Sequence, residues 1–191
     1  MGIPFDRTAN EKLRGVSRRE SLWLLLGDRT FAEAKMQEML DRKNRYYIDS
    51  LASITPQNLL PGALALLQDL RAAGIAVALG SASHNAPTVI ERLGIRDLFD
   101  AIADGSHASR SKPAPDVFLA AAQMLGVAPA FCAVVEDAEA GVEAALAAGM
   151  WAVGIGPDER VGAAHLVLPG LVGVTAASLQ QAFANAAWQV V

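Results

Sequence analysis

The sequence predicts an α/β fold, a Rossmann-like parallel sheet with helices on both faces, together with a small helical cap. Short apolar runs alternate with helix-like segments between residues 62 and 156, which is typical of a parallel sheet covered on both faces. Glycines close the helix-like segments at positions 74, 94, 126 and 149. Residues 1–54 contain no strand-like run. We therefore expect a helical cap domain over 1–54 and an α/β core over 55–191.

The first fifty residues predict helices throughout. "SRRE" at 17–20 has the form of a capping box, in which Ser17 accepts from the first turn and Glu20 reaches back. "TFAE" at 30–33 has the same form and predicts the start of a long helix through "AKMQEMLDRKNRYYIDSL". A small helical bundle is the expected product.

After "TPQNLLPG" at 55–62 the pattern changes to alternating elements. The predicted helices are "ALALLQDLRAAG", "APTVIERLG", "PDVFLAAAQMLG" and "AGVEAALAAG", and the predicted strands are "IAVALG", "AIAD", "CAVVE" and "WAVGIG". Ligands of such sheets bind beyond the carboxyl ends of the strands. Polar groups at those ends are therefore the candidate functional residues.

Composition indicates a globular protein and excludes some partners. Hydrophobic residues make up 52% of the 191 residues, and no run is long enough to span a membrane. The N-terminus lacks the apolar stretch of a signal peptide, and the single cysteine, Cys132, is expected to be a buried, inert thiol. The net charge of −4 argues against nucleic acid as a partner. We expect a cytoplasmic monomer.

Charge is distributed unevenly along the chain. Residues 1–50 hold ten basic and eight acidic side chains, whereas residues 51–191 hold six and twelve, so the two parts carry +2 and −6. A basic helical part facing an acidic core suits a small anion bridged to a metal. Two ordinary solvated surfaces would give the same pattern, and charge alone favours that simpler interpretation.

Two of the strand ends carry groups that suit a phosphate. "GSASHN" at 80–85 places Ser81 and Ser83 between a strand and a helix, where backbone N–H groups bind anions, although plain helix capping explains it equally well. Lys112 precedes Pro113, which disfavours a helical conformation at the lysine. A lysine in a stiff loop can serve as a fixed positive charge, although a solvated lysine is the commoner case.

The third strand end carries two adjacent carboxylates, Glu136 and Asp137. Mg²⁺ commonly takes one or two carboxylates together with phosphate and water. Two acids at a helix start, stabilised by the helix dipole, are the alternative. That alternative explains poorly why both follow the buried run "AVV".

The order of these groups, Ser-x-Ser, then Lys-Pro, then Glu-Asp, resembles the haloacid dehalogenase superfamily of phosphotransferases. More narrowly, "GVSRRESL", "RKNRYY", "SASHN", "SKPAPD" and "VVEDAEAG" are similar to segments of the β-phosphoglucomutases and related sugar phosphatases. The resemblance covers nearly the whole chain. The cap phrase together with "SASHN" points to the mutases.

The resemblance implies a role for each matching residue. Ser81 and Lys112 would hold the transferred phosphoryl group, and Glu136 and Asp137 would coordinate Mg²⁺. The second phosphate of the sugar bisphosphate and the sugar itself would be bound by Arg18, Ser83, His84 and Asn85, and by Ser21, Lys43 and Asn44. The implied reaction interconverts β-glucose 1-phosphate and glucose 6-phosphate through an aspartyl-phosphate, with glucose 1,6-bisphosphate as intermediate. A phosphatase that releases phosphate to water is the alternative.

The family's nucleophile is missing from this pattern. It lies in an Asp-x-Asp-Gly motif at the end of the first, central strand, and no such motif occurs in the sequence. We expect the neighbouring strands to face each other across a gap, with unpaired backbone groups costing about 1–3 kcal/mol each. Either the sequence is an incomplete mutase, which the retained Ser81, Lys112, Glu136 and Asp137 favour, or it is a non-catalytic phosphosugar-binding protein.

His84 departs from the mutase pattern, which has a lysine at that position. Histidine carries a positive charge mainly in the acid range. We therefore expect bisphosphate to bind more weakly at alkaline pH than at acid pH when the missing strand is supplied.

Overall fold

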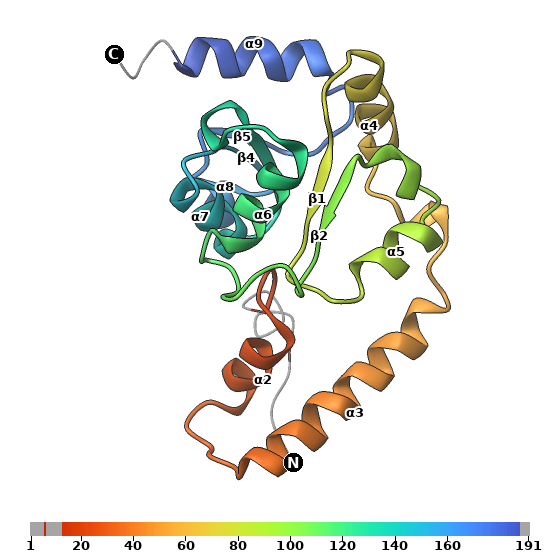
Figure 1. Cartoon of the computed structure of the whole chain (residues 1–191), viewed down its shortest axis with the longest axis vertical. Coiled ribbons are helices and arrows are strands. Elements are labelled where there is room, and N and C mark those ends of the chain that lie inside the picture. Colours follow the sequence, from red (N-terminus) through yellow and green to blue (C-terminus); the bar gives the residue numbers. More distant parts are fainter. Residues whose placement is uncertain (1–5, 7–12, 188–191) are drawn as a thin grey trace.

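The computed structural model describes residue 6 and residues 13–187, and it has two parts (Figure 1). A helical part, α2 and α3, lies at one end, and an α/β part occupies the rest of the molecule. The helices predicted for residues 1–12 fall outside the described residues, apart from residue 6, which lies in no helix.

The helical part is formed by α2 (Arg18–Leu26) and the long α3 (Glu33–Leu51). They pack through the buried side chains of Leu22, Leu26, Met36, Met39 and Leu40. Ser17 caps α2 as predicted, because its Oγ accepts from the Glu20 backbone N–H at 3.2 Å. Glu20 does not complete the box; its carboxylate contacts the Ser111 hydroxyl of the α/β part instead.

The capping box predicted at Thr30–Glu33 is wrong. α3 begins at Glu33 after Ala32, with no side-chain cap. The Glu33 carboxylate accepts two hydrogen bonds of 2.8 Å from the Arg19 guanidinium. This charge-assisted pair joins α2 to α3 and uses the carboxylate that a capping box would need.

The α/β part contains two separate parallel sheets. The first pairs β1 (Ala78–Gly80) with β2 (Ala101–Ala103), and α5 (Ala86–Arg92) connects them. The second has the order β3-β4-β5, formed by β3 (Ala133–Glu136), β4 (Trp151–Ile155) and β5 (Leu166–Leu168). Pairing is parallel throughout, which confirms the predicted fold class.

Helices cover both sheets. α6 (Asp116–Leu125) packs on β1 and β2, and α7 (Glu139–Ala147) packs on β3 and β4. The short α8 (Asp158–Val161) follows β4. On the other face α4 (Ala63–Ala72) meets α9 (Ala176–Ala187), which lies across the top of Figure 1. Single-turn 3₁₀ helices span Pro56–Asn58, Arg96–Leu98 and Pro129–Phe131.

The sheets are held by two apolar clusters. One lies under α6 and α7 and includes Val117, Val142 and Val161. The other, formed by Leu66, Trp151, Val153, Ile155 and Leu179, lies beneath α4 and α9. No helix in the described ranges is both long enough and apolar enough to cross a membrane.

Candidate functional site

Lys112 lies where the carboxyl ends of β1 and β3 approach each other. Its side chain is only 5% exposed. The ammonium donates to the Gly80 carbonyl at the end of β1, at 3.2 Å, and to the Glu136 carboxylate at the end of β3. It also lies 4.3 Å from the centre of the Phe118 ring. The lysine is therefore a buried, fixed charge and not a solvated side chain.

Glu136 is held at the first turn of α7. Its Oε2 accepts from the backbone N–H groups of Asp137 and Ala138, at 2.8 and 3.1 Å, while Oε1 faces Lys112. Gly141 makes room for it, since a side chain there would overlap the Glu136 carboxylate. The backbone donors and the ammonium together offset the cost of burying this charge.

Asp137 is more open than Glu136, with 49% of its side chain exposed. Its Oδ2 lies 2.7 Å from the Arg14 guanidinium, which comes from the segment just before α2. Two adjacent carboxylates are thus each paired with a different cation, Lys112 or Arg14. This pairing explains how the chain holds both acids side by side at the end of a strand.

The loop after β1 is ordered by its own hydroxyl groups. Ser81 donates its backbone N–H to the Ala103 carbonyl at 2.9 Å, and its Oγ accepts from the Ser83 N–H. The Ser83 Oγ in turn accepts from the Asn85 N–H at 3.2 Å. Asn85, the residue before α5, makes no side-chain cap to its helix. The hydroxyls therefore shape the loop by bonds within it and leave the Asn85 amide for another contact, whereas the helix capping by Ser83 or Asn85 that the sequence left open does not occur.

That contact joins the two parts of the molecule. Asn85 Nδ2 donates to Asn44 Oδ1 of α3 at 3.1 Å. Of the residues predicted to bind the sugar, Asn44 therefore approaches the loop that carries Ser83, His84 and Asn85.

The remaining predicted residues of the helical part form a second group. Lys43 Nζ donates to Ser21 Oγ at 2.7 Å, and Ser21 donates to the Arg18 carbonyl. Burial lowers the pKa of Lys43, and the nearby charge of Arg18 lowers it further. Two cations close enough to disfavour each other's charge favour the binding of an anion.

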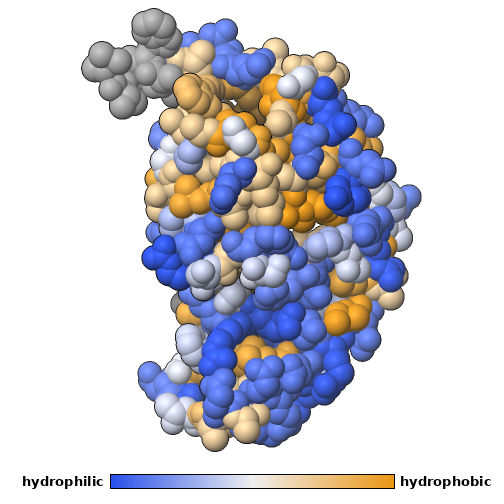
Figure 2. All heavy atoms as spheres, in the orientation of Figure 1, coloured by the Kyte–Doolittle hydropathy of each residue, from blue (hydrophilic) through white to orange (hydrophobic). Residues whose placement is uncertain are grey.

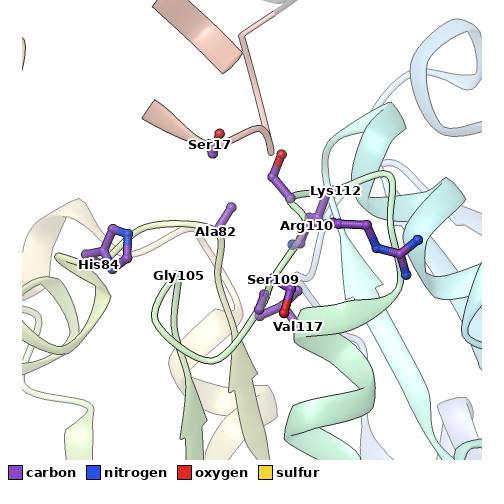
Figure 3. A pocket seen from close by; sticks show the side chains of 10 residues that line it. Ser17, Ala82, His84, Gly105, Ser109, Arg110, Lys112 and Val117 are labelled. Atoms are coloured by element: carbon purple, nitrogen blue, oxygen red, sulfur yellow. The ribbon is translucent and has the colours of Figure 1, made fainter. Parts of the chain in front are cut away.

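A cavity of about 140 Å³ lies between the helical part and the loops of the α/β part (Figure 3). Ser17 lies on one side, opposite Ala82, His84 and Lys112. His84 and Lys112 are the two predicted site residues that line it. The cavity is not lined by Ser81, Glu136 or Asp137. Glu136 is hydrogen-bonded to Lys112, which does line it.

Sequence reasoning missed several contributors. Ser109, Arg110 and Ser111 line the cavity immediately before Lys112. Hydrogen bonding to the Asp116 carboxylate raises the pKa of Arg110 and holds its guanidinium beside α6. The polar run "SRSK" was the available signal for these residues, whereas Arg14 had no signal at all.

The residues offer a partial metal site. Within residue 6 and residues 13–187, no cluster of three or more His, Cys, Asp or Glu side chains occurs. Asp137 and Glu136 nevertheless fit Mg²⁺, which accepts one or two carboxylates and completes its shell with other oxygens. Asp137 fits better, because Glu136 already accepts three hydrogen bonds and has little capacity left.

Comparison with known proteins finds relatives in sequence and in structure. The chain is 46% identical over 170 residues to a β-phosphoglucomutase from Bacillus subtilis, covering 87% of this chain and 75% of the relative. The crystal structure of a β-phosphoglucomutase from Clostridium difficile superposes with a TM-score of 0.92 at 38% identity, covering 96% of this chain and 84% of the other.

A shorter stretch of the chain is similar to a protein with a different activity, a sugar-phosphate phosphatase. A fructose-1-phosphate phosphatase from Escherichia coli is 48% identical over 81 residues, which are 42% of this chain and 43% of the relative. The family model for haloacid dehalogenase-like hydrolases matches residues 2–149. The chain therefore belongs to the haloacid dehalogenase-like hydrolase family.

Proposed function

We propose that the site is that of a β-phosphoglucomutase-like, Mg²⁺-dependent phosphotransferase, which binds β-glucose 1-phosphate, glucose 6-phosphate and their bisphosphate. The observation that carries the proposal is the buried Lys112, fixed between Gly80 and Glu136 beside a cavity that opens toward the helical part. The similarity to two β-phosphoglucomutases supports the choice of substrate. We also propose that residues 1–54 act as a cap on the core formed by residues 55–191.

At the core, Lys112 and Ser81 would hold the transferred phosphoryl group. The ammonium is immobile and partly desolvated, so its attraction to phosphoryl oxygens is stronger than that of a solvated lysine. Ser81 directly follows Gly80, whose carbonyl accepts from Lys112, and this neighbourhood supports assigning its hydroxyl to the same phosphoryl group. Such preorganised groups lower the barrier by stabilising charge on the equatorial oxygens.

Asp137 and Glu136 would hold Mg²⁺, which would neutralise phosphoryl charge when bound. Before the ion is bound, Arg14 occupies the Asp137 carboxylate. Lys112 keeps Glu136 in place in either case, because the ion pair is shielded from solvent.

On the cap side, Arg18 would bind the second phosphate together with Ser83, His84 and Asn85. Ser21, Lys43 and Asn44 would face the sugar. The pKa of Lys43 is lowered first by burial and then by the charge of Arg18, and the second cause supports the proposal, because an anion that bridges the two cations would relieve their repulsion. The Asn44–Asn85 hydrogen bond would hold the sugar-binding residues of α3 next to the phosphate-binding loop of residues 83–85.

The sequence holds no Asp-x-Asp-Gly motif to supply the aspartyl nucleophile. We therefore expect these 191 residues to bind phosphosugar without turnover. A strand that carries the two aspartates, supplied to the chain, would be required for the mutase reaction.

Calorimetric titration with glucose 6-phosphate, in the presence and absence of Mg²⁺, tests the proposal. Glucose 6-phosphate should bind and glucose should not, and Lys112→Met should weaken binding at least about tenfold, roughly 1.4 kcal/mol. Lys35→Met is the matched control, since Lys35 is exposed on α3 and pairs with Glu38. Equal binding of glucose and glucose 6-phosphate, or no effect of Lys112→Met, would rule the proposal out.

A sugar-phosphate phosphatase is the second candidate, supported by the match to the fructose-1-phosphate phosphatase. The two activities differ in whether the phosphoryl group returns to the sugar or passes to water. With a nucleophile-bearing strand supplied, formation of glucose 6-phosphate from β-glucose 1-phosphate indicates the mutase. Release of inorganic phosphate alone indicates the phosphatase.

A further inference from the structure

The cavity between the helical part and the α/β part is smaller than a usual small-molecule site. Its volume is about 140 Å³, whereas such sites commonly measure about 300–1,000 Å³. A phosphosugar therefore enters this cavity only if the two parts first separate. This need for separation rests on the proposed function.

The junction between the two parts is bridged by polar side chains. The helical part has an apolar cluster of its own, and none of its members belongs to the two clusters that hold the sheets. Hydrogen bonds join the parts across the cavity, and they include those of Glu20 with Ser111 and of Asn44 with Asn85. On the face shown in Figure 2, hydrophilic residues predominate over the lower half, where Figure 1 places the helical part and the junction. Relative motion of two parts is expected at a polar junction of this kind.

The contact made by Glu20 has a local alternative. Glu20 is the third residue of α2, and Ser17 caps this helix by accepting from the Glu20 backbone N–H at 3.2 Å. In a complete capping box the glutamate would also return to the Ser17 backbone N–H. Its carboxylate instead accepts from the Ser111 hydroxyl of the α/β part. Glu20 thus has two alternative partners, one in its own helix and one across the cavity.

The surroundings of Glu20 allow it to change partner at little cost. The adjacent cation, Arg19, is bonded to Glu33 by two hydrogen bonds of 2.8 Å. The Ser111 hydroxyl and the Ser17 amide are both uncharged, so the carboxylate exchanges one neutral donor for another. It also remains in the first turn of α2, where the helix dipole favours a negative charge.

Ser111 connects Glu20 to the phosphate-binding side of the cavity. It lines the cavity and directly precedes the buried Lys112. The ammonium end of Lys112 is held by the Gly80 carbonyl and the Glu136 carboxylate. The contact with Glu20 holds the same loop from the opposite side, through the residue next to the lysine.

We propose that Glu20 is a positioning residue that changes partner with the position of the helical part. When the two parts are together, Glu20 accepts from Ser111 and fixes the loop that carries Lys112. When they separate, it returns to the Ser17 N–H and completes the capping box. The second partner compensates for the loss of the first, so the parts separate more readily than they would with a residue that bonds only across the cavity.

Exchange of the Ser17 amide with solvent, measured by NMR on the full 191-residue chain without ligand, tests the change of partner. Ser111→Ala removes the partner across the cavity and leaves the capping box possible. The Ser17 amide should then exchange at least about threefold more slowly than in the wild type, because Glu20 is bonded to it for more of the time. Unchanged or faster exchange of the Ser17 amide would overturn the proposal.

Further variants separate this effect from a general change in the junction. The slower exchange at Ser17 should disappear when Glu20→Ala is added to Ser111→Ala. It should persist when Glu20→Gln is added instead, because glutamine also completes a capping box. Ser50→Ala is the matched control, since Ser50 is exposed on α3 and donates to the Tyr47 carbonyl at 2.6 Å, and it should leave Ser17 unchanged. Slow exchange that survives Glu20→Ala would show that Glu20 is not the partner.

Calorimetric titration with glucose 6-phosphate tests the positioning role. Ser111→Ala should weaken binding at least about fivefold, whereas Glu20→Ala should weaken it less, because this change removes a partner from both positions of the helical part. In the Glu20→Ala background, Ser111→Ala should change the affinity less than about twofold. A larger change in that background would mean that Ser111 contacts the ligand directly, and equal losses in the two single variants would mean that Glu20 has one partner only. Either result would overturn the proposal.

The two measurements distinguish this proposal from the proposed function. If the wild type does not bind glucose 6-phosphate, the proposed function is wrong, but the exchange of the Ser17 amide still decides the role of Glu20. If the wild type binds glucose 6-phosphate and Ser111→Ala does not slow exchange at Ser17, only the role of Glu20 is wrong. None of the substituted residues is buried, so circular dichroism should show that every variant folds.

Discussion

The Lys112–Glu136 pair is the most buried ion pair among the described residues, with side chains 5% and 11% exposed. Burying two charges costs several kcal/mol each, which their attraction and extra hydrogen bonds must offset. Glu136 has those bonds from the backbone of Asp137 and Ala138. Lys112 has the Gly80 carbonyl and the face of Phe118.

Removing one partner should therefore cost more than removing both. We expect Lys112→Met to destabilise the chain by about 3–5 kcal/mol, because it leaves a buried carboxylate uncompensated. Adding Glu136→Gln to Lys112→Met should recover much of the loss. Urea unfolding of the single and double variants measures this coupling, and additive losses would contradict it.

Lys43 gives a prediction about pH. Burial, followed by the charge of Arg18, lowers the pKa of Lys43 in the folded chain below its ordinary value of 10.5. Between the lowered value and 10.5 the unfolded chain binds more protons than the folded chain, so stability from this group rises with pH across that window. At neutral pH the charged Lys43 therefore reduces stability.

Lys43→Met should raise the unfolding temperature at pH 7, and the difference from the wild type should disappear as the pH passes 10.5. Ser21 remains bonded in this variant, because its hydroxyl also donates to the Arg18 carbonyl. Thermal unfolding from pH 7 to pH 10.5 provides the measurement, and Lys35→Met on the same helix is the control. A stabilisation that is constant across this range would point to packing instead of charge.

At the scale of single residues, the sequence predicted which charged groups follow strand ends but not which residues they contact. Ser81, Lys112, Glu136 and Asp137 follow strand ends, and parallel strands bring their carboxyl ends to one edge. Arg14 lies 123 residues from Asp137, and Ser111 lies 91 residues from Glu20. Such contacts depend on how the helical part packs against the α/β part, and no local sequence pattern predicts that packing. Cys132, expected to be buried, is half-buried, and burial raises the pKa of its thiol.

Among the elements, α4 depends on a close backbone approach at its start. Gly62 has a φ of 87° and lies against the Leu171–Val172 backbone, where an added Cβ would overlap. Asp69, near the end of α4, accepts from the Ala176 backbone N–H at the start of α9, at 2.6 Å. The start of α4 thus lies against the segment before α9, and its later part bonds to the first residue of α9.

Gly62→Ala should be more destabilising than the same change at Gly74. Gly74 has a φ of 72° but no neighbour within 4 Å, so Gly74→Ala should cost only backbone strain, about 1–2 kcal/mol. Gly62→Ala adds overpacking of on the order of 1–3 kcal/mol. Urea unfolding of the two variants compares them, and equal losses would show that the approach of Leu171 is easily relaxed.

Helix and strand alternation was predictable from residue 62 to residue 156, but the three later elements, α8, β5 and α9, were not predicted. β5 has three residues, too few for a clear alternation, and its place is set by pairing with β4. α9 follows β5 and packs against α4, a helix more than a hundred residues earlier in the chain, so its place in the fold depends on a distant contact. The capping box predicted at Thr30 does not form, and the Glu33 carboxylate pairs instead with Arg19, fourteen residues away, a contact that no local pattern predicts.

For the whole molecule, the main feature is that the sheet is in two pieces. β4 is buried along its length and paired on both sides, whereas β1 pairs on one side only within residues 13–187. Local opening should therefore be much easier in β1 than in β4.

Native-state hydrogen exchange should show this difference directly. In the free chain we expect amides of β4 to exchange at least about a hundredfold more slowly than those of β1, equivalent to roughly 2.7 kcal/mol. Mass spectrometry of peptides that cover residues 76–82 and 150–156 provides the comparison. Similar rates would indicate that the two sheets open as a single unit.

The position of α6 has one more consequence. It packs on the first sheet and against α7, and it carries Phe118, whose ring touches both Lys112 and the space beside Gly80. Any change in the separation of the two sheets must therefore displace the ammonium relative to one of its two anchors. The position of the Lys112 charge therefore depends on the distance between β1, which it contacts at Gly80, and β3, which it contacts at Glu136.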